Sequence, residues 1–201
     1  MILICSAWDE ETKYLDLGND VEILNLGIGY LNAALKLERY LKSSEKPIER
    51  IVFIGTAGLI AYNEQKFEMD DSKIYSIKKV SLGDYLSKLD YSYVPVEYKV
   101  HEIESFNDLE DPLSKAVAFS NLEITKSPKL SEKILEEYPS QTLVENMELY
   151  GIAAIAADHK TPLSSFLVTT NYTNFFAHED WKANHKEASK NLCDYVSKLC
   201  F

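Results

Sequence analysis

The chain has 201 residues, 46% of them hydrophobic, which excludes a disordered protein and predicts one domain over residues 1–201. Its formal net charge is −11, and its lysines and arginines form no cluster, which argues against a nucleic-acid-binding surface. No apolar stretch approaches the roughly 20 residues that cross a bilayer, and the N-terminus lacks a signal-peptide pattern. Three cysteines at irregular spacing fit neither a metal site nor a disulfide framework, so we expect a reduced, cytoplasmic protein.

The N-terminal part of the chain has the pattern of an α/β protein. Short, nearly continuous apolar runs predict buried strands over Ile2–Ala7, Val21–Gly27 and Arg50–Ile54. Apolar residues at helical spacing predict a helix over Leu31–Ser43, between the second and third strands. A glycine-containing turn, Gly55-Thr56-Ala57-Gly58, closes the third strand. This order of elements is typical of the α/β class.

The rest of the chain continues the alternation of strands and helices. Alternating and β-branched residues predict partly exposed strands over Lys73–Tyr85 and Pro95–Ile103. The further expected elements are strands over Lys115–Phe119, Thr142–Glu145 and Ser165–Thr169, and helices over Ser131–Tyr138, Asn146–His159 and His178–Leu199. We therefore predict a three-layer αβα fold around a central mixed, mostly parallel twisted sheet.

Polar segments follow several of the predicted strands, at the sheet edge where ligands of open α/β sheets bind. They are Asp9-Glu10-Glu11, Gly55-Thr56-Ala57-Gly58, Asn146-Met147-Glu148 and Thr170-Asn171. Glu148 is the most informative, because it begins an otherwise apolar run and a buried carboxylate needs partners. Its two oxygens suit the paired hydroxyls of a sugar, although an acid stabilised by the helix dipole remains the alternative.

The sequence predicts no metal and no organic cofactor. Gly27-Ile28-Gly29 lacks the third glycine of a dinucleotide-binding fingerprint, where Asn32 stands instead. His178 and His185 lie seven residues apart on one predicted helix, too far apart to share a metal ion. We interpret these two histidines as neighbours on a surface helix.

Together these segments resemble the nucleoside phosphorylase/nucleosidase superfamily, and best its hydrolase branch of methylthioadenosine/S-adenosylhomocysteine nucleosidases and futalosine hydrolases. The resemblance is carried by the opening strand with Trp8-Asp9-Glu10-Glu11, by Leu26-Gly27-Ile28-Gly29-Tyr30-Leu31-Asn32-Ala33-Ala34, by Gly55-Thr56-Ala57-Gly58 and by Val144-Glu145-Asn146-Met147-Glu148. It implies a nucleoside phosphorylase-like fold, a small nucleoside as the partner molecule, and a homodimer.

The resemblance also implies a role for each matching residue. Glu11 would be the catalytic carboxylate, and Asn171 would hold N7 of the departing base. The ribose would be bound by Thr56, Met147 and Glu148, and the base by Glu123, Ile124 and Thr170.

Two departures from the family pattern refine this hypothesis. Phosphorylases carry an arginine before the glycine turn, whereas Val52-Phe53-Ile54 stands here, so we expect water rather than phosphate as the nucleophile. Asn171 replaces the aspartate of adenine-specific enzymes, which favours a 6-oxopurine such as that of a futalosine-like substrate. One alternative is a phosphorolytic purine nucleoside phosphorylase. The other is a catalytically silent nucleoside-binding paralogue, which is consistent with Glu123 at a position where the family often has a base-stacking aromatic residue.

Overall fold

The computed structural model describes residues 1–18, 20–83, 92–93, 95, 99–106 and 113–200. Its strands are β1 (Ile2–Ser6), β2 (Val21–Asn25), β3 (Arg50–Leu59), β4 (Ile74–Leu82), β5 (His101–Glu102), β6 (Ser114–Ser120), β7 (Leu143–Glu145) and β8 (Leu163–Tyr172). The helices are α1 (Tyr30–Ser43), α3 (Pro128–Glu137), α4 (Leu149–Asp158) and α5 (Ala177–Cys200), with short 3-10 turns η1 (Asp9–Glu11) and η2 (Met69–Asp71). Among these described residues, no helix combines the length and hydropathy needed to cross a membrane.

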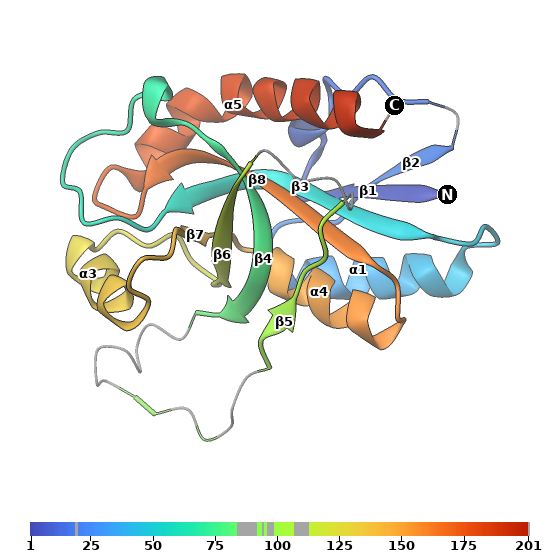
Figure 1. The fold of residues 1–201 in the computed structure, drawn as a ribbon, viewed down its shortest axis with the longest axis horizontal. Coiled ribbons are helices and arrows are strands. Elements are labelled where there is room, and N and C mark those ends of the chain that lie inside the picture. Colours follow the sequence, from blue (N-terminus) through green and yellow to red (C-terminus); the bar gives the residue numbers. More distant parts are fainter. Residues whose placement is uncertain (19, 84–91, 94, 96–98, 107–112, 201) are drawn as a thin grey trace.

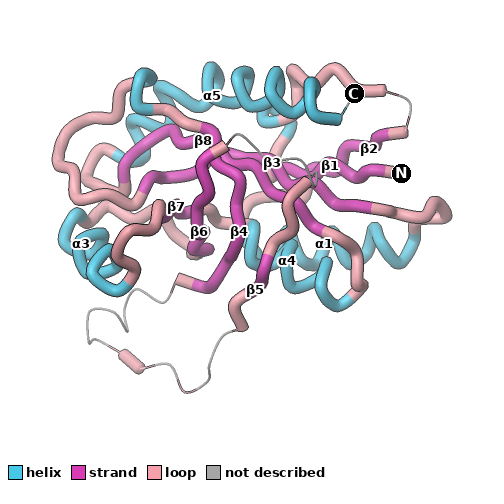
Figure 2. Tube along the Cα trace, viewed as in Figure 1, coloured by secondary structure: helices cyan, strands magenta, loops and turns pink. Residues whose placement is uncertain are grey.

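Helices cover both faces of a mixed sheet, as Figures 1 and 2 show, with α5 on one side and α1 and α4 on the other. Neighbouring residues of β1 point to opposite faces, so Leu3 packs toward α1 and α4 while Ile4 packs toward α5. Both faces of β1 and β3 are therefore buried, which explains their continuous apolar runs. This part of the prediction, an α/β fold with a mixed sheet between helices, is confirmed.

The sheet differs from the open sheet that we predicted, because its strands close on themselves. β3 pairs in parallel with β1 on one side and with β8 on the other, and its last residues turn to pair with β7. From β7 the pairing continues through β6 and β4 back to β8, which completes a ring. The prediction was wrong here because β3 and β8 are each ten residues long and pair with different partners along their lengths.

The segment 55–58 lies inside β3, although the sequence predicts a turn there. The register between β3 and β8 shifts at this point, where Ala57 pairs with Thr169 and Gly58 with Asn171. Thr170 is the extra residue of this β-bulge, which bends the strand and re-aims the side chains beside it. The bulge thus sets the direction of Asn171.

Two further predicted elements differ in extent. The predicted strand Pro95–Ile103 is reduced to β5 where the structure describes it, and residues 96–98 lie outside the described residues. Helix α4 begins at Leu149, with Glu148 as its N-cap residue, rather than at Asn146. The Asn146 side chain turns back onto this start of the helix. Its Oδ1 accepts the backbone N–H groups of Glu148 and Leu149, both at 2.9 Å, so Asn146 stands before the first turn.

Candidate active site

A cavity of about 580 Å³ lies where the residues after β1, the second half of β3, the end of β8 and the start of α4 meet. Its volume is within the range of roughly 300–1,000 Å³ that small-molecule sites occupy. The predicted site residues that line it are Glu11, Thr56, Glu123, Ile124, Met147, Glu148 and Asn171. The chain fold therefore brings together side chains from five separate parts of the sequence.

Glu11 is held in the turn η1, directly after β1, with only 4% of its surface exposed. Its Oε2 accepts the backbone N–H of Ala7 at 3.0 Å, and its Oε1 accepts the backbone N–H of Thr56 at 2.9 Å. Burial, and then the charge of Glu148, raise the pKa of the Glu11 carboxyl to about 7, although these hydrogen bonds oppose the shift. A carboxyl group with this pKa can act as a general base near neutral pH.

Glu148 directly precedes α4 and is equally buried. Its Oε1 accepts the backbone N–H of Gly29 at 2.9 Å, and its Oε2 accepts the side-chain amide of Asn146 at 3.0 Å. Gly29 has a φ of 89°, a conformation that a side chain would strain. Burial raises the pKa of Glu148. Each carboxylate oxygen retains lone-pair capacity for a ligand hydroxyl.

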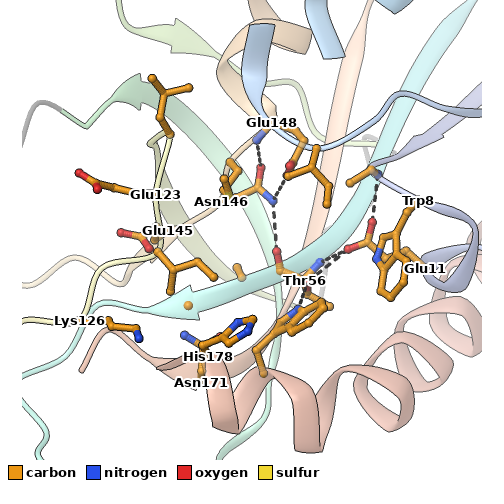
Figure 3. Close-up of a pocket in the computed structure, with 18 residues that line it drawn as sticks. Trp8, Glu11, Thr56, Glu123, Lys126, Glu145, Asn146, Glu148, Asn171 and His178 are labelled. Atoms are coloured by element: carbon orange, nitrogen blue, oxygen red, sulfur yellow. Dashed lines mark hydrogen bonds between the residues drawn. The ribbon is translucent and has the colours of Figure 1, made fainter. Parts of the chain in front are cut away.

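Asn146 connects the two carboxylates, as the dashed lines in Figure 3 show. Its amide nitrogen donates to Glu148 Oε2 and also to the backbone oxygen of Thr56, at 3.1 Å. The backbone N–H of Thr56 in turn donates to Glu11. This continuous network fixes the relative positions of Glu11 and Glu148. No role was predicted for Asn146 from the sequence, although an asparagine just before a predicted helix is a signal for side-chain hydrogen bonds to its first backbone N–H groups.

Aromatic side chains form the wall beside Glu11. The Trp181 indole N–H donates to the Thr56 hydroxyl at 3.2 Å, and the Trp181 ring stacks on His185 with centroids 4.6 Å apart. His178 stacks on the same ring with centroids 5.9 Å apart and also lines the cavity, as do Trp8 and Trp181. The interpretation of the two histidines as surface neighbours was wrong, because Trp181 lies between them at helical spacing and draws both into the stack.

Asn171 has a defined amide orientation. Its Oδ1 accepts the hydroxyl of Thr170 at 2.9 Å, and its Nδ2 donates to the backbone oxygen of Tyr172 at 3.1 Å. The amide packs closely against Gly58, because a Cβ atom added at Gly58 would lie 2.9 Å from Nδ2 of Asn171. Thr170, predicted to contact the base, is fully buried and not among the lining residues, so it contacts Asn171 instead.

The segment 121–126 forms the opposite wall, and it is anchored by Glu145 at the end of β7. The buried Glu145 carboxylate accepts the side-chain amide of Asn121 at 2.8 Å and the backbone N–H of Thr125 at 2.9 Å. The Thr125 hydroxyl also donates to it. Glu123, Ile124 and Lys126 are exposed residues of this segment that line the cavity. This role of Glu145 was not predicted from the sequence, because its partners Asn121 and Thr125 lie 24 and 20 residues away along the chain.

The described residues hold no group of three or more histidine, cysteine or acidic side chains that could bind a metal ion. The described cysteines Cys5 and Cys193 are free and buried. Burial raises the pKa of both thiols, that of Cys193 to about 11, which keeps them protonated. The polar groups that face the cavity are therefore carboxylates, amides, histidine and lysine.

The fold matches those of solved nucleosidases. A mutant of futalosine hydrolase from Helicobacter pylori superposes with a TM-score of 0.75 at 16% identity, over 97% of this chain and 96% of that one. The methylthioadenosine/S-adenosylhomocysteine nucleosidase of the same organism gives a TM-score of 0.74 at 14% identity, over 98% and 96%. That of Neisseria meningitidis, in complex with methylthio-immucillin-A, gives 0.72 at 13% identity, over 98% of each chain.

No protein-family model matches the sequence, and no curated protein matches it. At such low identities the structural likeness establishes the fold. The chain therefore has the fold of these solved nucleosidases and of futalosine hydrolase.

Proposed function

We propose that this protein hydrolyses the N-ribosidic bond of a purine-type nucleoside. The observation that carries the proposal is the buried Glu11 carboxyl, which faces a nucleoside-sized cavity and has a pKa of about 7. A second buried carboxylate, Glu148, lies across the same network. The fold is one on which solved nucleosidases are built.

The proposed reaction develops positive charge on the ribose and negative charge on the base as the bond between them breaks. Glu11 takes a proton from the water that attacks C1′. Glu148 accepts hydrogen bonds from the 2′ and 3′ hydroxyls, and Met147 packs against the sugar. Two buried carboxylates beside a cationic sugar stabilise the transition state more than the neutral ground state. Thr56 orients Glu11 through its backbone N–H and hydroxyl.

Water is the proposed nucleophile, because the cavity lacks an arginine that could bind free phosphate. The chain has two arginines, Arg39 and Arg50, and neither lines the cavity. Arg50 donates to the Ser164 hydroxyl at 2.8 Å and lies 3.7 Å from Glu104. Phosphate bound beside Glu11 and Glu148 would therefore meet negative charge without an arginine to offset it.

A 6-oxopurine is the proposed base. The Asn171 amide has one N–H bonded to Tyr172, which leaves the other to hold N7 of the base. An amide cannot supply a proton, and hypoxanthine, which departs more easily than adenine, needs less acid catalysis. The segment that carries Glu123 and Ile124 would meet the other edge of the base.

The test is a product assay on inosine, adenosine, methylthioadenosine and a futalosine-type nucleoside, each with and without phosphate. We expect free base from the 6-oxopurine nucleosides without phosphate. Release that requires phosphate would make the protein a phosphorylase. No release from any of them, combined with binding of the nucleosides, would identify a silent paralogue.

We also propose that the protein forms a homodimer through the exposed face of α1. Leu31 and Leu35 are one helical turn apart and 60% and 48% exposed, and Ile28, beside them, is 59% exposed and lines the cavity. Such adjacent apolar side chains favour burial against a second surface. Light scattering should give the dimer mass for the wild type and the monomer mass for Leu31→Glu. A monomeric wild type would contradict the proposal.

A further inference from the structure

The charged side chains that line the cavity lie at two separate ends of it. Glu11 and Glu148 lie at one end, whereas Lys126 and His178 lie at the other, beside Asn171 (Figure 3). In this view the Lys126 side chain points toward Asn171 and His178. Within the described part of the chain, no ion pair or hydrogen bond engages the Lys126 ammonium. The cavity thus places a free cation opposite its two buried carboxylates.

Glu123 and Glu145, the other two acidic residues that line the cavity, do not neutralise this lysine. Glu145 is 5% exposed, and its carboxylate accepts hydrogen bonds from Asn121 and Thr125, which offset its charge. Glu123 is exposed, and Figure 3 shows its carboxylate pointing away from Lys126. The other basic group at this end is His178, whose Nδ1 is buried without a hydrogen-bond partner among the described residues. This end of the cavity therefore favours a ligand that accepts hydrogen bonds and carries negative charge.

We propose that Lys126 is a catalytic and specificity-determining residue, whose ammonium donates a hydrogen bond to the 6-oxo oxygen of the departing purine. The inference rests on the proposed function and names the group that selects the base. An ammonium has only donors, so it pairs with a 6-oxo oxygen and not with the 6-amino group of adenine, which is itself a donor. Asn171 holds N7 while Lys126 holds the neighbouring oxygen.

The bonds and charges balance without a proton from Lys126. The C1′–N9 bond breaks, and its electron pair goes to the base, whose negative charge spreads onto the 6-oxo oxygen. The oxygen of water bonds to C1′, and the proton that water loses goes to Glu11. The base then takes a proton from solvent, and Glu11 releases its own to solvent. Lys126 stabilises the anion and stays charged, because a nearby cation favours the negative charge that develops in the transition state.

The test compares Lys126→Met with Lys129→Met, which removes a lysine charge from an exposed position of α3 that does not line the cavity. The three substrates are inosine, adenosine and p-nitrophenyl β-D-ribofuranoside, whose leaving group needs no help from a donor. For Lys126→Met we expect kcat/KM on inosine to fall about 10²-fold, at the lower end of acid–base contributions. Activity on the other two substrates should stay unchanged, as should every activity of Lys129→Met.

A second measurement does not depend on turnover. Calorimetry with free hypoxanthine should show about 10- to 10²-fold weaker binding to Lys126→Met than to the wild type, as expected for a lost hydrogen bond to a charged group. Adenine binding should not weaken. Equal losses on all ligands, or no loss on hypoxanthine and inosine, would overturn the role of Lys126. A wild type that binds hypoxanthine through Lys126 but cleaves no substrate would instead contradict the proposed function.

Discussion

The two ends of the cavity are built in different ways. At the Glu11 end, the carboxylates of Glu11 and Glu148 are 4% and 5% exposed and are held by backbone N–H groups of the sheet and of the turn before α1. At the Lys126 end, Leu122 is 67% and Ile124 is 37% exposed, on a segment anchored mainly through Glu145. In the proposed reaction, the cleavage step needs fixed geometry, whereas the choice of base needs only side chains that can vary on an exposed segment.

The largest expected effect lies at the buried end. Glu11→Gln removes the proposed general base, so the rate of base release should fall by about 10²- to 10⁴-fold. Because only the ionised carboxyl accepts a proton and its pKa is about 7, wild-type kcat/KM should rise with pH up to about 7 and then level. Steady-state assays from acid to mildly alkaline pH would measure both effects. Near-full turnover by Glu11→Gln would remove Glu11 from the mechanism.

The same substitution should change the pH dependence of stability. The pKa of Glu11 rises from 4.5 in the unfolded chain to about 7 in the fold, so the folded state binds the proton more tightly. Its stabilising contribution is present below pH 4.5 and is lost as the pH rises through about 7, a change of about 3 kcal/mol. Urea unfolding at pH 5 and pH 8 should show this decline in the wild type and a smaller one in Glu11→Gln. Equal declines in the wild type and in Glu11→Gln would mean that folding does not raise the pKa of Glu11.

Glu148→Gln tests the sugar side of the same end. It replaces a charged acceptor of the ribose hydroxyls, and hydrogen bonds to charged groups contribute about 1.5–3 kcal/mol. We expect kcat/KM on a ribonucleoside to fall about 10- to 10²-fold, and the loss on its 2′-deoxy analogue to be smaller. A purely structural role would lower both by the same factor, so the ratio of the two substrates decides between them.

The smallest effect should be at the exposed end. Glu145→Gln keeps the size of the side chain but replaces an acceptor of the Thr125 and Asn121 hydrogen bonds with an amide, which should cost about 1–3 kcal/mol of stability. The segment that carries Ile124 would then be less well placed. We expect weaker discrimination between inosine and adenosine with an unchanged preference for ribose over 2′-deoxyribose. If Glu145→Gln altered the ribose preference instead, the two ends would not be independent.

Much of the fold and of the buried end could be predicted because their signals are local. Continuous apolar runs predicted β1, β2 and the first half of β3, and the resemblance of Trp8-Asp9-Glu10-Glu11 to the nucleosidase pattern indicated Glu11. Glu148 was found as a carboxylate at the head of an apolar helix. The start of α4 and the extent of β3 were predicted less well, because the hydrogen bonds of the Asn146 side chain and the pairing of β3 with β8, whose register shifts at Gly58, are not specified by local apolar patterns.

Only the tertiary structure decided the remaining features, because they join residues far apart in the chain. The ring closes through pairing of β8 with both β3 and β4, which no local pattern specifies. Trp181 reaches Thr56 across 125 residues and stacks on both His178 and His185, of which His178 lines the cavity. The sequence by itself indicated Glu11, Glu148 and Asn171 as candidate site residues, whereas packing between distant segments decided that Asn171 and Lys126, which no sequence pattern indicated, face the same cavity.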